Sequence, residues 1–224
     1  MSRKVLLHMY MTLDGFAELP EYPELTPGTT DDFWEVMWTG HWDQVDTLLL
    51  GRKTFERWAG FWPDYVDDPN EHMRGFARFS TRVEKVVFSR SLESTTWANS
   101  RIVRGPAAEE LARLRGVPGK NMVVGGGPRF VQSLLAEGLA DELYLTVYPS
   151  IVGQGKPLFH LQPDPDHYDD IVPVGAPNRH DFRLLEARGL VSGSVFLHYD
   201  LTARPLSKTG PAARPVPRKR SRRT

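Results

Sequence analysis

Short apolar runs alternate with amphipathic segments along most of the chain. Apolar runs that end at glycine or at polar residues are typical of buried strands, whereas apolar positions three and four apart are typical of helices. The pattern predicts strands at residues 5–11, 47–50, 85–88, 101–103, 121–124 and 143–147. Between these strands it predicts helices at residues 31–40, 53–58, 71–80, 107–115 and 128–137.

The end of the chain has a different pattern. Two strands are predicted at residues 182–188 and 195–201, joined by a glycine-containing turn. Because strands that alternate with helices form parallel sheets, the predicted fold class is α/β, a mostly parallel central sheet with helices on both faces and a C-terminal antiparallel hairpin. No repeat or linker interrupts this order, so residues 1–203 are predicted to form one domain.

Composition and charge exclude several classes of protein. The 224 residues include 28 Lys and Arg, 28 Asp and Glu, and no cysteine. A disulfide scaffold, a thiolate nucleophile and a cysteine-ligated zinc site are therefore excluded. Eight of the basic residues and no acid fall in the proline-rich tail 204–224, which we expect to be disordered. The acidic remainder does not favour a specific nucleic-acid partner.

The N-terminus superficially resembles a signal peptide because basic residues precede an apolar stretch. His8 interrupts this stretch, Asp14 ends it, and no small-residue cleavage site follows. No apolar run approaches the roughly 18 residues that a membrane span requires. We therefore expect a cytoplasmic protein with no membrane contact.

Two segments combine a short apolar strand, a glycine and the start of a helix. They read LLLGRKTFERW and MVVGGGPRFVQSLL, at residues 48–58 and 122–135. In open parallel sheets, ligands bind beyond the carboxyl ends of the strands, where glycine allows close approach and helix N-termini attract anions. Two such turns fit the phosphates of one dinucleotide. Neither segment is a G-x-G-x-x-G fingerprint or a Walker A loop, and a glycine that only relieves backbone strain is the alternative.

Basic and hydroxyl side chains follow two of the predicted strands. Arg52 and Lys53 follow one strand, and Ser89 and Arg90 follow the next. A guanidinium fork beside a hydroxyl suits the 2′-phosphate that distinguishes NADP from NAD. Arginines solvated at strand ends are the alternative. Aspartates and histidines in residues 160–170 match no metal-binding spacing, so no metal is expected.

These segments together resemble the dihydrofolate reductase-like fold. Within it, the chain is similar to the reductase domain of the bacterial bifunctional riboflavin-biosynthesis protein and its stand-alone relatives. The matching pieces are TLDG, LLLGRKTFE, VVFSRSLE, VVGGGPRFVQSLL, ADELYLTVYPSIVGQGKPLF and SVFLHYDL, which occur in the family's order between residues 4 and 201. No deaminase motif is present, so the resemblance concerns the reductase alone.

The resemblance implies a bound NADPH and hydride transfer from it to an electrophilic carbon of a small molecule. Residues 51–54 correspond to the phosphate-binding turn, residues 125–129 to the pyrophosphate turn, and Met11 to the strand beside the nicotinamide. The residues implied to contact the cofactor are Met11, Gly51, Arg52, Lys53, Thr54, Ser89, Arg90, Gly125, Gly126, Gly127 and Arg129.

The substrate side is less defined by sequence. We expect Asp14 and Glu35 to be the catalytic acids. Dihydrofolate reductases carry an acid on the first helix, and no local motif fixes whether Asp31, Asp32 or Glu35 corresponds to it. Acids that only stabilise the helix dipole in the first turns are the alternative. The expected activity is that of a 5-amino-6-(5-phosphoribosylamino)uracil reductase acting on a small heterocyclic or sugar-bearing substrate. Alternatives are dihydrofolate reductase activity and a non-catalytic nucleotide-binding protein on the same fold.

The resemblance also implies a homodimer. Tyr144, Thr146 and Tyr148 alternate with apolar residues on one predicted strand. Tyrosine is enriched at protein interfaces because it combines contact area with a hydrogen-bonding tip. An interface through this face is one interpretation of the pattern, and packing of the tyrosines under a neighbouring helix is the other.

Overall fold

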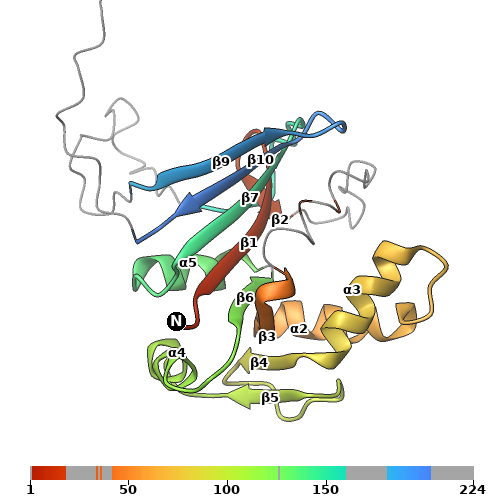
Figure 1. The fold of residues 1–224 in the computed structure, drawn as a ribbon, viewed down its shortest axis with the longest axis vertical. Helices are drawn as coiled ribbons and strands as arrows, with labels where there is room; N and C mark the ends of the chain where they lie inside the picture. Colours follow the sequence, from red (N-terminus) through yellow and green to blue (C-terminus); the bar gives the residue numbers. More distant parts are fainter. Residues whose placement is uncertain are drawn as a thin grey trace, which may run out of the picture.

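A computed structural model describes residues 2–18, 34, 36, 42–125, 127–159 and 181–202. An eight-stranded sheet with the order β5-β4-β3-β6-β1-β7-β10-β9 forms the centre (Figure 1). Its strands are β1 (Val5–Thr12), β3 (Val45–Gly51), β4 (Glu84–Phe88), β5 (Ser100–Val103), β6 (Asn121–Gly125), β7 (Glu142–Tyr148), β9 (Arg183–Gly189) and β10 (Val195–Asp200). Neighbouring strands are parallel, except that β10 is antiparallel to both β7 and β9.

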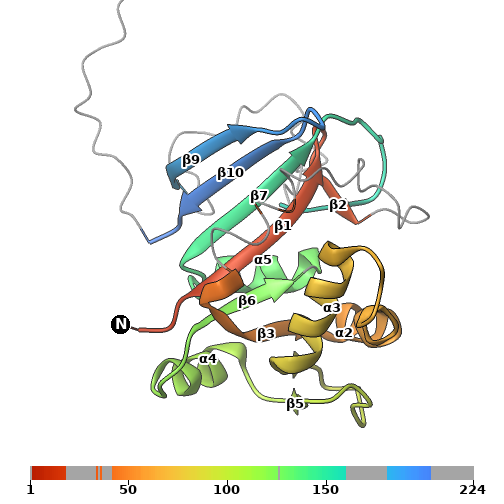
Figure 2. The same ribbon diagram turned by 45° about the vertical axis from the view of Figure 1, so that its right-hand side comes forward.

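Helices cover both faces of the sheet. The helices α2 (Arg52–Ala59) and α3 (Glu71–Arg82) lie on one face, and α4 (Ala107–Arg115) and α5 (Pro128–Ala136) lie on the other (Figures 1 and 2). Short 3-10 turns occur at Trp42–Gln44 and Trp62–Tyr65. The predicted fold class is therefore confirmed.

Side chains of the central strands alternate between two apolar layers. On β1, Leu6 packs on the α2 and α3 side, whereas Val5 and Leu7 pack on the α4 and α5 side. All three are at most 1% exposed. Burial on both faces explains why these strands are continuous apolar runs rather than alternating ones.

The predicted helix ends have the expected chemistry. The Asn70 side chain accepts hydrogen bonds from the amides of His72 and Met73 at the start of α3. Pro128 occupies the first turn of α5, and Gly116 follows the last residue of α4. These caps satisfy backbone groups that a helix end leaves unpaired.

One small element was not predicted, and three predicted segments lie wholly or mostly outside the described residues. A small two-stranded sheet of β2 (Phe16–Glu18) and β8 (Lys156–Pro157) was not predicted. The predicted helix at residues 31–40 lies almost wholly outside the described residues, although Trp34 and Val36 are helical. The histidine- and aspartate-rich loop and the basic tail also lie outside them.

The tyrosine-bearing face of β7 belongs to the protomer's own core. Tyr144, Thr146 and Tyr148 are all less than 8% exposed. The Tyr144 ring stacks on His198 with ring centroids 4.1 Å apart. These side chains are thus buried within the protomer and do not form an exposed interface, and their ring partners lie on the neighbouring strands β10 and β1 rather than on a helix.

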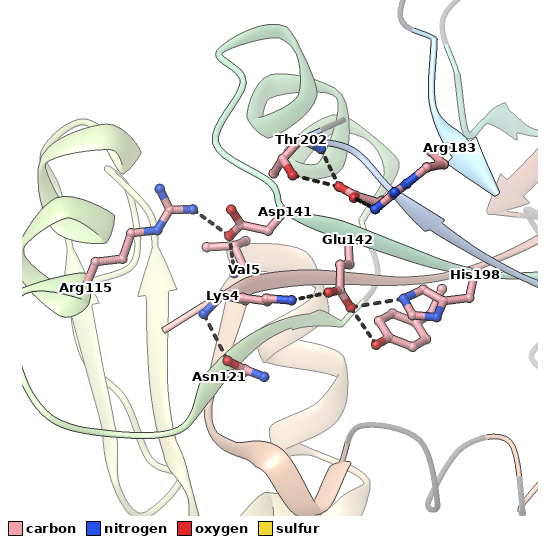
Figure 3. A network of polar contacts seen from close by, with 11 residues as sticks. Lys4, Val5, Arg115, Asn121, Asp141, Glu142, Arg183, His198 and Thr202 are labelled. Atoms are coloured by element: carbon pink, nitrogen blue, oxygen red, sulfur yellow. Dashed lines mark hydrogen bonds and ion pairs between the residues drawn. The ribbon is translucent and has the colours of Figure 1, made fainter. Parts of the chain in front are cut away.

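A partly buried carboxylate joins β7, β10 and the residue before β1, at the edge of the sheet where β1 and β7 begin and β10 ends (Figure 3). Glu142 of β7 accepts hydrogen bonds from Lys4 Nζ at 2.5 Å and from the Tyr144 hydroxyl at 2.8 Å, and its Oε2 lies 3.0 Å from His198 Nε2 on β10. Its contact with His198, followed by those with Lys4 and Tyr144, outweighs desolvation and lowers the pKa of Glu142 to about 2.

We expect Glu142→Gln to lower the free energy of unfolding by about 1.5 kcal/mol at neutral pH, because a charged acceptor is lost. A depressed pKa means that this stabilisation is present above the ordinary value of 4.5 and is lost as pH falls towards 2. Urea unfolding of both proteins at pH 7 and pH 3 measures the difference. If the difference in unfolding free energy between the two proteins is larger at pH 3 than at pH 7, the ionised Glu142 carboxylate does not stabilise the fold in this way.

Candidate functional site

Two glycine turns lie side by side at the carboxyl edge of the sheet. The strands β3 and β6 are parallel neighbours in which Leu49 pairs with Val124, and each strand ends at a glycine, Gly51 or Gly125. The helices α2 and α5 begin directly beyond these turns. The predicted phosphate-binding segments therefore meet at one place.

The glycines are required by close approach and by backbone conformation. A Cβ atom added to Gly125 would lie only 2.4 Å from Cη2 of Trp58, because the indole ring of this α2 residue packs directly on the Gly125 backbone. Gly127 has φ +78°, a conformation that L-residues rarely adopt, and a Cβ atom there lies 3.2 Å from Thr54 Oγ1. The start of α5 is thus packed against the first turns of α2.

Both helices begin without a side-chain cap. The N-cap residues are Gly51 and Gly127, neither of which supplies a side-chain hydrogen bond. Their first-turn amides and the positive ends of both helix dipoles therefore face the same edge. Lys53 and Arg129 are exposed beside them. This arrangement fits the negatively charged phosphates of a dinucleotide.

The residues after β3 and β4 also come together. Gly51 pairs with Phe88 across these parallel strands, so Arg52 and Ser89 start from neighbouring positions. Arg52 forms an ion pair with Glu56 at 3.0 Å. Within the described part of the chain, no ion pair engages the exposed Arg90. Of the two predicted arginines, Arg90 is therefore the one that no ion pair engages among the described residues.

The end of β1 carries an aromatic pair. Met11 is half-buried and pairs with Val147 of β7. The preceding residue, Tyr10, stacks on Tyr148 with an interplanar angle of 5° and centroids 5.9 Å apart. Burial raises the pKa of both tyrosines, so both stay neutral at physiological pH. Met11 and Tyr10 point to opposite faces of the sheet.

Asp14 is held by donors from two segments. Its carboxylate accepts from the Thr12 hydroxyl at 2.6 Å and from the amides of Val152 and Gly153 at 3.1 and 2.7 Å. The bond from Thr12, followed by the backbone bonds, lowers the pKa of Asp14. An ionised carboxylate with three donors is a poor proton donor, and it fixes the loop after β7 beside the end of β1.

The sequence missed two features of this site. The contact of Trp58 with Gly125 is one of them, because it depends on tertiary packing. Gln132 of α5 donates to the carbonyls of Pro157 and Leu158 at 3.1 and 3.0 Å, which fastens β8 to the same edge. The predicted residues Glu35 and Gly126 lie outside the described residues.

The comparisons with known proteins identify the family. The RibD C-terminal domain family matches residues 3–170, and the chain belongs to it. An uncharacterised Bacillus subtilis (strain 168) protein, YyaP, is 31% identical over 203 residues, covering 88% of this chain and 95% of its own. The fold is the dihydrofolate reductase-like one, and the family is reductase-like.

Two solved structures are similar in fold. One is a Thermotoga maritima diaminohydroxyphosphoribosylaminopyrimidine deaminase/5-amino-6-(5-phosphoribosylamino)uracil reductase, with TM-score 0.58 and 17% identity over 89% of this chain and 57% of that one. The other is Enterococcus faecalis dihydrofolate reductase complexed with NADP(H) and RAB-propyl, with TM-score 0.53 and 15% identity over 91% of this chain and all of that one.

The described part of the chain has neither a membrane-spanning helix nor a cluster of metal-binding side chains. Among these residues, no helix is long and apolar enough to cross a membrane. The same residues hold no group of three or more His, Cys, Asp or Glu arranged to bind a metal ion.

Proposed function

We propose that this protein is an NADPH-dependent reductase of the riboflavin-biosynthesis type, which transfers hydride to a small heterocyclic or sugar-bearing substrate. The observation that carries the proposal is the pair of uncapped helix starts behind Gly51 and Gly127, which lie side by side at the carboxyl edge. Free amides at two adjacent helix starts suit a phosphate-bearing ligand.

Each part of the edge has a proposed role toward the cofactor. The amides at the start of α2, from Arg52 to Thr54, bind one phosphate of the cofactor's pyrophosphate, and Gly127 and Arg129 bind the other. Ser89 and Arg90 bind the 2′-phosphate, and Met11 lies beside the nicotinamide. When bound, NADPH supplies the hydride, while this chain orients it and limits water access.

The substrate is proposed to bind on the face that carries α2 and α3. Trp58 and Trp62 lie there as partly buried rings in T-shaped contact, with centroids 6.4 Å apart. Such rings suit a flat heterocycle. The Thermotoga maritima protein is, by its name, a reductase of a uracil derivative, which supports a pyrimidine as the substrate here. We propose that Asp14 positions the loop after β7 and that Glu35 donates the proton.

Cofactor oxidation tests the proposal. The protein is mixed with NADPH and with either dihydrofolate or an aminopyrimidine that carries a ribosylamino group. The absorbance of NADPH is then followed over time. Oxidation with a pyrimidine supports the riboflavin-type activity, and oxidation with dihydrofolate alone supports the alternative activity. Binding without turnover on either class supports a non-catalytic nucleotide-binding protein. A cytoplasmic location is proposed together with this activity.

We also propose a homodimer that forms through β9 rather than through the tyrosines of β7. This edge strand exposes Leu184 and Leu185 by 50% and 46%. Sedimentation equilibrium at tens of micromolar protein is expected to give twice the 25.4 kDa chain mass. Leu185→Glu is expected to restore the monomer, whereas Val117→Glu, at another exposed apolar position, is not. A monomeric wild-type protein contradicts the proposal.

A further inference from the structure

Three neighbouring strands end in register, and each is followed by an arginine. Gly51 of β3 pairs with Phe88 of β4, and Phe88 pairs with Val103 of β5. Arg52 and Arg104 come one residue after their strands, and Arg90 comes two residues after its own. Arg52 and Arg90 stand out in the sequence. The third arginine, Arg104, has a different set of contacts from the others.

The guanidinium of Arg104 binds the backbone of the turn that follows β4. Its Nη1 donates to the Arg90 carbonyl and its Nη2 to the Leu92 carbonyl, each at 2.8 Å. The amide of Ser89 donates to the Val103 carbonyl at 3.0 Å, directly before Arg104. The end of β5 therefore holds the turn at residues 89–92 through three hydrogen bonds.

The same turn is also fixed from within. The hydroxyl oxygen of Ser89 accepts from the amides of Ser91 and Leu92 at 3.3 and 2.9 Å. Among the described residues no acceptor takes the Ser89 hydroxyl proton. Five backbone polar groups of the turn are thus hydrogen-bonded within the protein, and the Ser89 hydroxyl proton and the Arg90 guanidinium are available to a ligand.

We propose that Arg104 is a positioning residue for cofactor selection. It fixes the turn so that Ser89 and Arg90 converge on the 2′-phosphate of the nucleotide. This inference rests on the proposed function. Arginine is needed because its planar fork reaches two carbonyls at once, whereas a lysine ammonium is a single point of charge.

The test uses fragments of the cofactor. Binding of 2′,5′-ADP and of 5′-AMP is measured by titration calorimetry for the wild-type protein, Arg104→Lys and Arg104→Gln. Both variants are expected to weaken 2′,5′-ADP about tenfold, the effect of roughly one lost hydrogen bond to a charged group, and to leave 5′-AMP unchanged. Arg78→Gln is the matched control, because Arg78 is an exposed arginine that donates to the Val66 carbonyl at 2.7 Å on another element.

Amide hydrogen exchange gives a readout that needs no cofactor. The amides of Ser91 and Leu92 are expected to exchange faster in Arg104→Gln than in the wild-type protein, and not in Arg78→Gln. Unchanged affinity for 2′,5′-ADP, or equal losses for both nucleotides, overturns the inference and leaves the proposed function intact. A wild-type protein that binds neither nucleotide overturns both.

Discussion

Replacing Gly127 with valine is expected to raise the dissociation constant for NADPH by about 100-fold or more. The φ angle of +78° disfavours a β-branched residue, and the added Cβ lies 3.2 Å from Thr54 Oγ1. The side chain also occupies space that the pyrophosphate needs beside the start of α5. Strain and blocked access act together, so this is the largest effect expected in the molecule.

A matched variant separates backbone strain from loss of the site. Gly138 also has positive φ, +64°, but a Cβ there has nothing within 4 Å, and it follows the other end of α5. Gly138→Val is expected to lower the melting temperature by a similar amount and to bind NADPH normally. If Gly127→Val stays folded by circular dichroism and binds NADPH as the wild-type protein does, the pyrophosphate lies elsewhere.

Replacing Arg90 with alanine is expected to weaken NADPH binding about 10- to 100-fold and to leave NADH binding unchanged. A charge-assisted hydrogen bond contributes about 1.5–3 kcal/mol, and the 2′-phosphate is the group that NADH lacks. The effect of Arg52→Ala is expected to have the same direction but a smaller size, because Glu56 already engages that guanidinium.

Titration of NADPH and NADH into the wild-type, Arg90→Ala and Arg52→Ala proteins measures how much each substitution weakens the binding of each cofactor. Equal losses for the two cofactors in Arg90→Ala exclude a 2′-phosphate role for this side chain. A larger selective loss in Arg52→Ala than in Arg90→Ala shows instead that the Glu56 pair opens when the cofactor binds.

The order of strands and helices could be predicted because most of it depends on local signals. The central strands are apolar on both faces, and Asn70 and Pro128 mark two helix starts in the sequence itself. The β2–β8 pair could not be predicted, because β8 has two residues and its pairing depends on contacts far along the chain. The tyrosines of β7 alternate as an interface strand does, but neighbouring strands supply their ring contacts, β10 through Phe196 and His198 for Tyr144 and β1 through Tyr10 for Tyr148.

The candidate site divides in the same way. Gly51 and Gly127 could be found because a strand, a glycine and a helix start are contiguous in sequence. Three contacts could not be found from the sequence. They are the packing of Trp58 on Gly125, the hydrogen bonds from the Arg104 guanidinium to the turn at residues 89–92, and those from the amides of residues 152 and 153 to Asp14. Each joins segments that only the folded chain brings together, and the last one changes the proposed role of Asp14 from acid to positioning residue.

Binding of NADPH by the two glycine turns is tested most directly by titration calorimetry. The wild-type protein is titrated with NADPH and with NADH at equal ionic strength. We expect one NADPH site per chain and NADH binding that is weaker by about tenfold or more, the contribution expected from contacts to the 2′-phosphate. Absence of NADPH binding, or equal affinity for the two cofactors, contradicts the proposed function.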